Sequence, residues 1–143
     1  IQWKRIKYSA GQKSKHFKNK NDLLIAIASQ GFKQWQKTSE DIFNNASLLP
    51  KQAFQQFFKR YIDFAVTHPA MYQLMFGNTL WLNSESQQLA QTAHPCFQFQ
   101  LSLTKRWQQQ NVLNNHEDPL RLTQVTWATM HGIAINHAWH CYQ

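Results

Sequence analysis

Cysteine, glycine, proline and valine are all scarce in this chain. Its 143 residues include two cysteines, four glycines, four prolines and three valines. Two distant cysteines, Cys96 and Cys141, cannot form the disulfide framework of a small secreted domain, so a reducing cytoplasm is the simpler expectation. Leucine, alanine, glutamine and lysine are abundant instead, and this composition favours an all-α fold.

Long apolar runs are also lacking. No run approaches the roughly 20 apolar residues of a membrane-spanning helix, and residues 1–20 lack the apolar core of a signal peptide. We therefore expect a soluble, cytoplasmic protein without a membrane partner.

Acidic residues are few, and the basic residues are unevenly placed. The chain has 15 Lys and Arg against seven Asp and Glu, for a formal net charge of +8. Seven of the basic residues lie within residues 1–20, which contain no acid, and the remaining body is nearly neutral. Such asymmetry indicates nucleic acid or an anionic surface as partner, although a solvated basic tail has the same composition.

Residue patterns that carry catalysis or bind metal are missing. There is no Gly-rich phosphate loop, no Ser or Cys nucleophile motif and no pair of carboxylates, so we expect neither an enzyme nor a cofactor. The C-terminal region holds His131, His137, His140 and Cys141. His137 and Cys141 share one helical face, but two ligands on one turn do not make a metal site. We expect no metal.

Apolar periodicity and capping residues predict five helices in one domain. We expect them from Lys20 to about Asn45, from Leu49-Pro50 to His68-Pro69, over residues 67–76, from Ser84 to Asn111 with a kink or break at Pro95, and from Asp118-Pro119 to about Cys141. Residues 79–83 and 111–116 are predicted to be loops. The predicted core stripe of the first helix is Leu24, Ile27, Ala28, Gly31, Phe32 and Trp35, and that of the fourth is Leu89, Ala93, Phe97, Leu101, Thr104 and Trp107.

The last helix is apolar almost all the way round between Val125 and Ile135. A surface helix of a monomer needs only one apolar stripe, so this pattern predicts that two copies of the chain pair through the helix. Ala128 and Gly132, four residues apart, would let two backbones approach closely. The predicted dimer interface consists of Trp127, Ala128, Gly132, Ile135 and Trp139.

Four motifs resemble the TetR family of bacterial transcriptional regulators. His16-Phe17-x-x-Lys20-x-x-Leu23 is similar to the end of the family's helix-turn-helix, and residues 6–11 have the spacing of its Ile-Ala-x-x-Ala-Gly motif. Residues 127–132 match the Trp-x-x-x-His-Gly signature of one class of C-terminal domain, and the run from His68 to Phe76 is also similar to the family. The matches lie at both ends of the chain and in the right order.

The resemblance implies a homodimeric regulator, usually a repressor. Residues 1–19 would form a partial helix-turn-helix head, and residues 20–143 a helical body for effector binding and dimerisation. The head would bind a palindromic operator in double-stranded DNA and leave it when a small-molecule effector occupies the body. The implied DNA-binding residues are Gln12, Lys13, Ser14, Lys15, His16 and Lys20.

The head also departs from the family pattern. Gly11 and His16 are five positions apart, about half the family's spacing, and Ser14 stands where tyrosine is usual. Either residues are missing from the sequence, or the recognition helix is shortened. In the second case the chain would be a dimeric helical ligand-binding or interaction module without DNA binding. In a complete regulator we expect a further helix before residue 1, and the family usually adds one after the last helix.

Aromatic residues and methionines of the body are candidates for an effector pocket, although each could be an ordinary core residue. The candidates are Phe57, Tyr61, Phe64, Met71, Met75, Phe97, Leu101, Met130 and His131. Methionine suits an adaptable cavity, and few ionisable groups accompany these side chains. We therefore expect an apolar or aromatic effector that is at most weakly charged, with Tyr61 and His131 as polar contacts.

Overall fold

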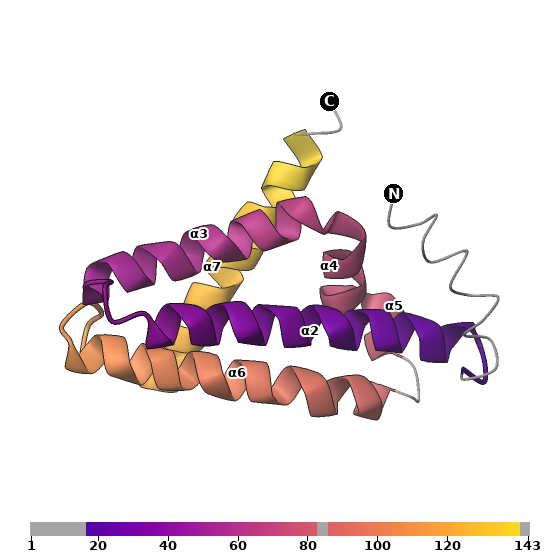
Figure 1. Ribbon diagram of the computed structural model, residues 1–143, viewed down its shortest axis with the longest axis horizontal. Helices are drawn as coiled ribbons and strands as arrows, with labels where there is room; N and C mark the ends of the chain where they lie inside the picture. The colour runs from indigo at the N-terminus through magenta and orange to yellow at the C-terminus, as the bar shows by residue number, and fades with distance from the viewer. Residues whose placement is uncertain (1–16, 83–85, 141–143) are drawn as a thin grey trace.

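The structure is a computed structural model that describes residues 17–82 and 86–140, and side chains as far as His137 (Figure 1). Its helices are α2 (Lys20–Asn44), α3 (Pro50–Thr67), α4 (Pro69–Phe76), α5 (Asn78–Trp81), α6 (Ser86–Gln109) and α7 (Pro119–His140). All regular structure in the described ranges is helical, so the predicted all-α fold is confirmed.

Local side-chain chemistry sets the ends of the long helices. Asn19 Oδ1 accepts a hydrogen bond from the Asp22 backbone N–H at 3.0 Å, which caps α2 as expected. Asp118 Oδ2 accepts from the Arg121 N–H at 3.1 Å, and Pro119 is the first residue of α7. Both helices therefore start where the sequence predicts.

The structure decides two predicted features. Residues 78–81 form the short helix α5 and not a loop, because Trp81 Nε1 donates to the Met75 carbonyl at 2.7 Å and folds the chain back onto α4. Helix α6 continues through the solvent-exposed Pro95, so the alternative of two separate helices is wrong. The predicted cap of α6 at Ser84 lies outside the described residues.

Helices α2 and α6 lie side by side, α3 runs along one edge of that pair, and α7 crosses the assembly obliquely (Figure 1). Two core clusters result. The aromatic cluster consists of Trp35, Ile42, Phe57, Tyr61, Ala65, Tyr72, Leu103, Trp107, Met130 and Ala134. The head-side cluster consists of Ile25, Ala28, Phe32, Met75, Leu80 and Leu89.

The buried face of α6 differs from the predicted stripe. Phe97 and Leu101 are only half-buried, whereas Gln100 and Leu103 are buried. From Leu89 to Leu101 the predicted residues follow one another in steps of four, and each such step rotates the stripe by about 40° on a helix of 3.6 residues per turn. The stripe therefore drifts until Phe97 and Leu101 leave the packed face, and the two steps of three that follow bring Thr104 and Trp107 back to it.

A buried pair of hydroxyls joins α6 to α7. Thr123 Oγ1 donates to Thr104 Oγ1 at 2.8 Å, and the exposed fractions of these side chains are 0% and 1%. The turn between the two helices is held by Gln108, whose Nε2 donates to the carbonyls of Asn114 and Glu117 at 2.8 Å each. Since buried polar groups are costly when unpaired, these bonds fix how α7 lies on α6.

Helices α2 and α4 approach closely at Gly31. A Cβ atom at this position would overlap the sulfur of Met75 and lie 2.9 Å from Cγ of Met71. Glycine is therefore required for this contact as it stands, and the contact places α4 directly against the N-terminal half of α2.

Candidate functional site

The N-terminal end of α2 carries the one predicted DNA-binding residue within the described ranges. Lys20 is the first residue of α2 and is exposed, and its neighbour Lys18 is exposed too. The N–H groups of a first helical turn favour anions. The other predicted residues, Gln12, Lys13, Ser14, Lys15 and His16, lie outside the described part of the chain.

The predicted effector-pocket residues are divided between the two clusters. Phe57, Tyr61 and Met130 belong to the aromatic cluster and are at most 2% exposed. Met75 belongs to the head-side cluster, with Met71 packed against it, and Phe64 touches both clusters. Phe97 and Leu101 are half-buried on α6, as is His131 on α7. Their role as an effector pocket stays a prediction.

A chain of hydrogen bonds joins α3, α4 and α7 inside the aromatic cluster. The hydroxyls of Tyr61 and Tyr72 are 2.8 Å apart, and the Tyr72 hydroxyl is 2.5 Å from Nδ1 of His131. The ring of Trp127 stacks on His131, with centroids 5.1 Å apart. Two of the predicted pocket residues, Tyr61 and His131, are thus linked through Tyr72.

Burial sets the protonation of this chain. It raises the pKa of Tyr61 far above its ordinary value and that of Tyr72 to about 12, and it lowers the pKa of His131. At neutral pH both phenols keep their protons, and the imidazole is neutral. In the tautomer with the proton on Nε2, Tyr72 donates to His131 Nδ1 and accepts from Tyr61. Each hydroxyl in the chain then has a partner.

Cys96 is the described cysteine, and it is not activated. Burial raises its pKa to about 11, and the nearby Glu40 acts in the same direction. Its thiol donates to the Phe32 carbonyl at 3.2 Å. A protonated thiol is a poor nucleophile, so Cys96 has a packing role.

The outward side of α7 is apolar and open. Its buried side, with Thr123, Met130 and Ala134, packs into the molecule. Exposed apolar residues on the helix are Leu120, Val125, Ile133 and Ile135, with exposed fractions between 40% and 55%. Ala128 and Gly132 are exposed as well, and a Cβ at Gly132 would meet nothing within 4 Å.

The predicted dimer residues fall mostly on this open side. Ala128, Gly132 and Ile135 are exposed, whereas Trp127 is half-buried against His131 and Phe76. The side chain of Trp139 lies outside the described residues. Helix α7 therefore offers an apolar surface that the described chain does not cover.

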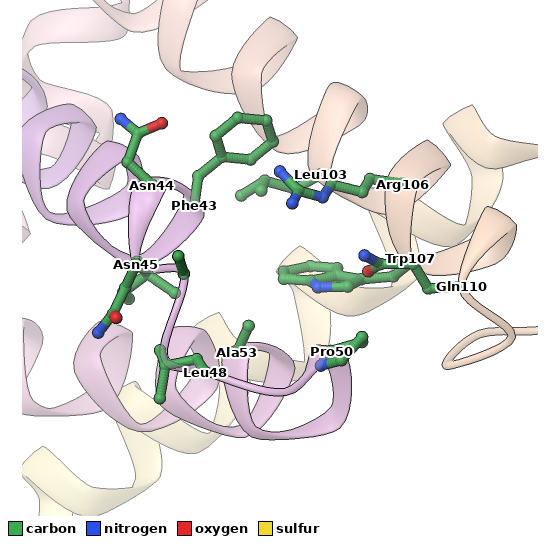
Figure 2. A pocket seen from close by; sticks show the side chains of 12 residues that line it. Phe43, Asn44, Asn45, Leu48, Pro50, Ala53, Leu103, Arg106, Trp107 and Gln110 are labelled. Carbon is green, nitrogen blue, oxygen red and sulfur yellow. The ribbon is translucent and has the colours of Figure 1, made fainter.

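A cavity of about 360 Å³ lies at the end of α2 farthest from Lys20. Its walls come from the last turn of α2, the loop to α3, the first turn of α3 and the last turns of α6 (Figure 2). Trp107 forms part of its floor, and the Arg106 guanidinium lies 4.2 Å from the centre of the Phe43 ring. None of the residues predicted for the effector pocket lines this distal cavity.

Within the described ranges, no group of three His, Cys, Asp or Glu side chains is placed to hold a metal ion. Among the same residues no helix is long and apolar enough to cross a membrane. The predicted pairing of His137 with Cys141 extends beyond the described residues.

Comparison with known proteins identifies the domain. Residues 54–138 match the tetracyclin repressor-like, C-terminal domain, which covers more than half of the chain. The chain belongs to the TetR-like family. The resemblance predicted from residues 16–24 and 127–132 is thereby confirmed at the level of the family.

One solved structure shares the TetR-like fold closely. It is described as a protein with unknown function from Rhodococcus sp. RHA1, is 26% identical, and superposes with a TM-score of 0.77. The match covers 88% of this chain but 64% of the other, so this chain spans less than two thirds of its relative's length. A search of curated proteins finds no match.

Two features of this TetR-like domain were not predicted from its sequence. Tyr72 lies in the family-like run from His68 to Phe76, but its pattern gives no sign that the hydroxyl bonds to His131, 59 residues away. The distal cavity depends on how three helix ends meet. One sign of the cavity in the sequence was Arg106, a basic residue in the last turn of α6.

Proposed function

We propose that the protein is a DNA-binding transcriptional regulator, acting as a repressor that a small-molecule effector releases from its operator. The observation that carries this proposal is the TetR-like domain over residues 54–138, joined through α2 to a cation-rich segment. Residues 1–19 would be part of the DNA-binding head and residues 20–143 the effector-binding and dimerisation body. The protein would be cytoplasmic and non-catalytic.

The proposed DNA contact is made by residues 1–20. Seven cations without an acid would attract the phosphate backbone. Lys20 and the N–H groups of the first turn of α2 would meet one phosphate, which positions the head without reading sequence. Base contacts would come from residues 12–16, and a palindromic operator would match a two-fold symmetric dimer.

The proposed homodimer forms through the open side of α7. Pairing two copies would remove exposed Val125, Ile133 and Ile135 from water, which is the main favourable term in association. Ala128 and Gly132 carry little or no side chain, so the paired backbones could approach closely at this point. Sedimentation of the wild-type protein as a monomer at micromolar concentration would contradict this part of the proposal.

The proposed effector binds among the residues predicted for the pocket, in contact with the chain of Tyr61, Tyr72 and His131. Buried Gln100 supports a ligand in the core, because its Nε2 has no hydrogen-bond partner among the described residues and would donate to a carbonyl group of the ligand. An effector that displaces Tyr72 would shift α4. Because α4 packs on α2 at Gly31, the shift would reach the helix that carries the head.

The decisive experiment measures DNA binding by the intact protein. Fluorescence anisotropy with operator fragments selected from genomic DNA should show salt-dependent binding. Replacing Lys20 by alanine should weaken binding to all sequences alike and reduce the slope against log salt concentration by about one. The exposed Lys51, in the first turn of α3 and beyond the opposite end of α2, provides the control, since Lys51→Ala should leave the slope unchanged.

Two outcomes would contradict DNA binding. One is an affinity that does not depend on salt, and the other is no binding by the intact chain. If the intact chain dimerises and binds small molecules but not DNA, the alternative is correct, and the protein is a dimeric ligand-binding or interaction module. Native mass spectrometry of the same sample reports chain mass, dimer and retained ligand together.

A further inference from the structure

The floor of the distal cavity is apolar and rigidly held. Leu103 and Trp107 are each 2% exposed, and Ile42 is 8% exposed. The Trp107 ring is fixed by edge-to-face contacts with Phe54 and Phe57, at centroid distances of 5.1 and 5.3 Å. Because the three floor side chains expose almost no surface, a ring entering the cavity would meet the half-buried Phe43, Leu48 and Ala53, which lie over this rigid floor. The volume of about 360 Å³ falls in the lower part of the usual range for small-molecule sites.

The wall of the cavity carries a cation without an acidic partner. Arg106 is exposed, and no Asp or Glu lies within ion-pair distance of it among residues 17–82 and 86–137. Its guanidinium rests on the ring of Phe43, which Phe99 supports from another side at 5.5 Å (Figure 2). An exposed cation–π contact is weak, so Arg106 can leave the Phe43 ring at little cost. Its planar guanidinium can then form two parallel hydrogen bonds with a carboxylate.

The remaining polar groups at the cavity also leave donors available. Asn45 Oδ1 already accepts from the backbone N–H of Ser47 at 3.1 Å and from its hydroxyl at 2.5 Å, so only the amide N–H groups of Asn45 are uncommitted. Two nearby helix-end carbonyls are also engaged, since Asn45 N–H donates to Ile42 O and Gln110 N–H donates to Arg106 O. Asn44 and Gln110 add amides that can donate or accept, and no carboxylate of the described residues lines the cavity, so a ligand with acceptor groups meets donors there.

We propose that the distal cavity binds a small aromatic carboxylate. The ring lies against Leu48 and Ala53, above Trp107, and the carboxylate pairs with Arg106, which turns away from Phe43. This site shares no residue with the proposed effector pocket in the core, and its ligand is charged where the core effector is not. Binding here does not depend on DNA binding, so a failure of the regulator proposal leaves this one standing.

The test compares acids with their neutral amides on the intact protein. Benzoate and phenylacetate are titrated against benzamide and phenylacetamide while the indole N–H signal of Trp107 is followed by NMR. The acids should bind about tenfold more tightly than the amides, because a hydrogen-bonded charge pair is lost in the amide complexes. Arg106→Gln should remove that preference. Lys105→Gln, an exposed neighbour with the same loss of charge, should retain it.

A second variant distinguishes binding in the cavity from a general effect of charge on binding. Ala53→Phe places a ring in the cavity without changing charge, and it should abolish binding of acids and amides while the far-ultraviolet circular dichroism remains helical. The proposal is overturned if no compound binds at millimolar concentration, or if acids and amides bind equally. It is also overturned if Arg106→Gln and Lys105→Gln weaken binding equally, or if Ala53→Phe leaves binding intact. Should Arg106→Gln fail to fold, the acid preference and Ala53→Phe decide.

Discussion

The aromatic cluster and the head-side cluster fill the same small domain in different ways. In the first, rings meet edge to face, as Trp35 does with Tyr61 at 5.1 Å and 87°. In the second, Met71 and Met75 lie against Gly31, and a single ring pair, Phe32 with Phe76 at 5.4 Å and 76°, also joins α2 to α4. Edge-to-face rings have few good arrangements, whereas unbranched methionines have many. The aromatic cluster is therefore the more fixed of the two, and the head-side cluster is the more adjustable.

Helix α4 belongs to both halves. Tyr72 faces the aromatic cluster and its hydrogen bonds, and Met75, three residues on, packs in the head-side cluster. The adjustable half lies against the part of α2 nearest the head. On the head side, methionines can adapt to a small movement of α4, whereas Tyr72 and Phe76 hold its other side in the aromatic cluster.

The largest effect is expected from Phe57→Ala. Phe57 is fully buried between Trp35 and Trp107, so its removal should lower the free energy of unfolding by about 3–5 kcal/mol. Met75→Ala is the matched change in the other half, where Met75 is 1% exposed. Urea unfolding should rank Phe57→Ala as the more damaging. An equal or reversed ranking would remove the distinction between the halves.

Tyr72→Phe should have the next largest effect. It removes the hydroxyl between Tyr61 and His131 and leaves both without that partner, which should cost about 1–3 kcal/mol of unfolding free energy. Tyr61→Phe removes the bond to Tyr72 and also a bond to Trp127, so it should cost a comparable amount. The double variant should lose less than the sum of the two single variants, because the bond that they share is lost only once. Chemical denaturation of the three variants checks this, and strictly additive losses would show that the hydrogen bonds do not act as a chain.

A smaller effect is expected from Gly31→Ala. The new Cβ overlaps the end of Met75, but methionine can move, and alanine gains helix propensity of up to about 1 kcal/mol over glycine. The net change in unfolding free energy should stay within about 1 kcal/mol. Gln30→Ala, at an exposed neighbouring position, is the control. A loss of several kcal/mol at Gly31 would mean that the head-side cluster is as fixed as the aromatic one.

The smallest effect concerns pH. Burial lowers the pKa of His131 below its ordinary value of 6.5, so the folded protein favours the neutral imidazole. The unfolded chain then binds the proton first, and stability should be complete above pH 6.5 and fall as the pH drops below it. His131→Asn should flatten this dependence, measured as melting temperature between pH 5 and 8, more than His94→Asn at an exposed site does. Equal flattening by both would rule out His131 as the source.

The sequence alone predicted what local chemistry decides. The starts of α2, α3 and α7 follow from Asn19, Pro50 and Asp118, each of which acts on its own first turn. The family followed from motifs at the two ends of the chain. These features need no knowledge of what packs against them.

What the sequence could not predict depends on neighbours distant in the chain. Helix α5 forms because Trp81 reaches back to the Met75 carbonyl, and Leu103 replaces Leu101 in the core because the other helices decide which side of α6 is covered. Likewise, Tyr72 can link Tyr61 to His131 only when α3, α4 and α7 pack together. Periodicity indicates which side of a helix is apolar, and tertiary packing decides which residues of that side are buried.

The hydroxyl pair of Thr104 and Thr123 has a consequence for assembly. Sliding α7 by one turn, or rotating it, would break the bond between the two hydroxyls, each of which also bonds to a carbonyl of its own helix, and would strain the bonds of Gln108 to the turn. The tilt of α7 is thus set by contacts inside a single chain. In the proposed dimer, two copies would meet as preformed bodies, and the angle between them would follow from these interior contacts.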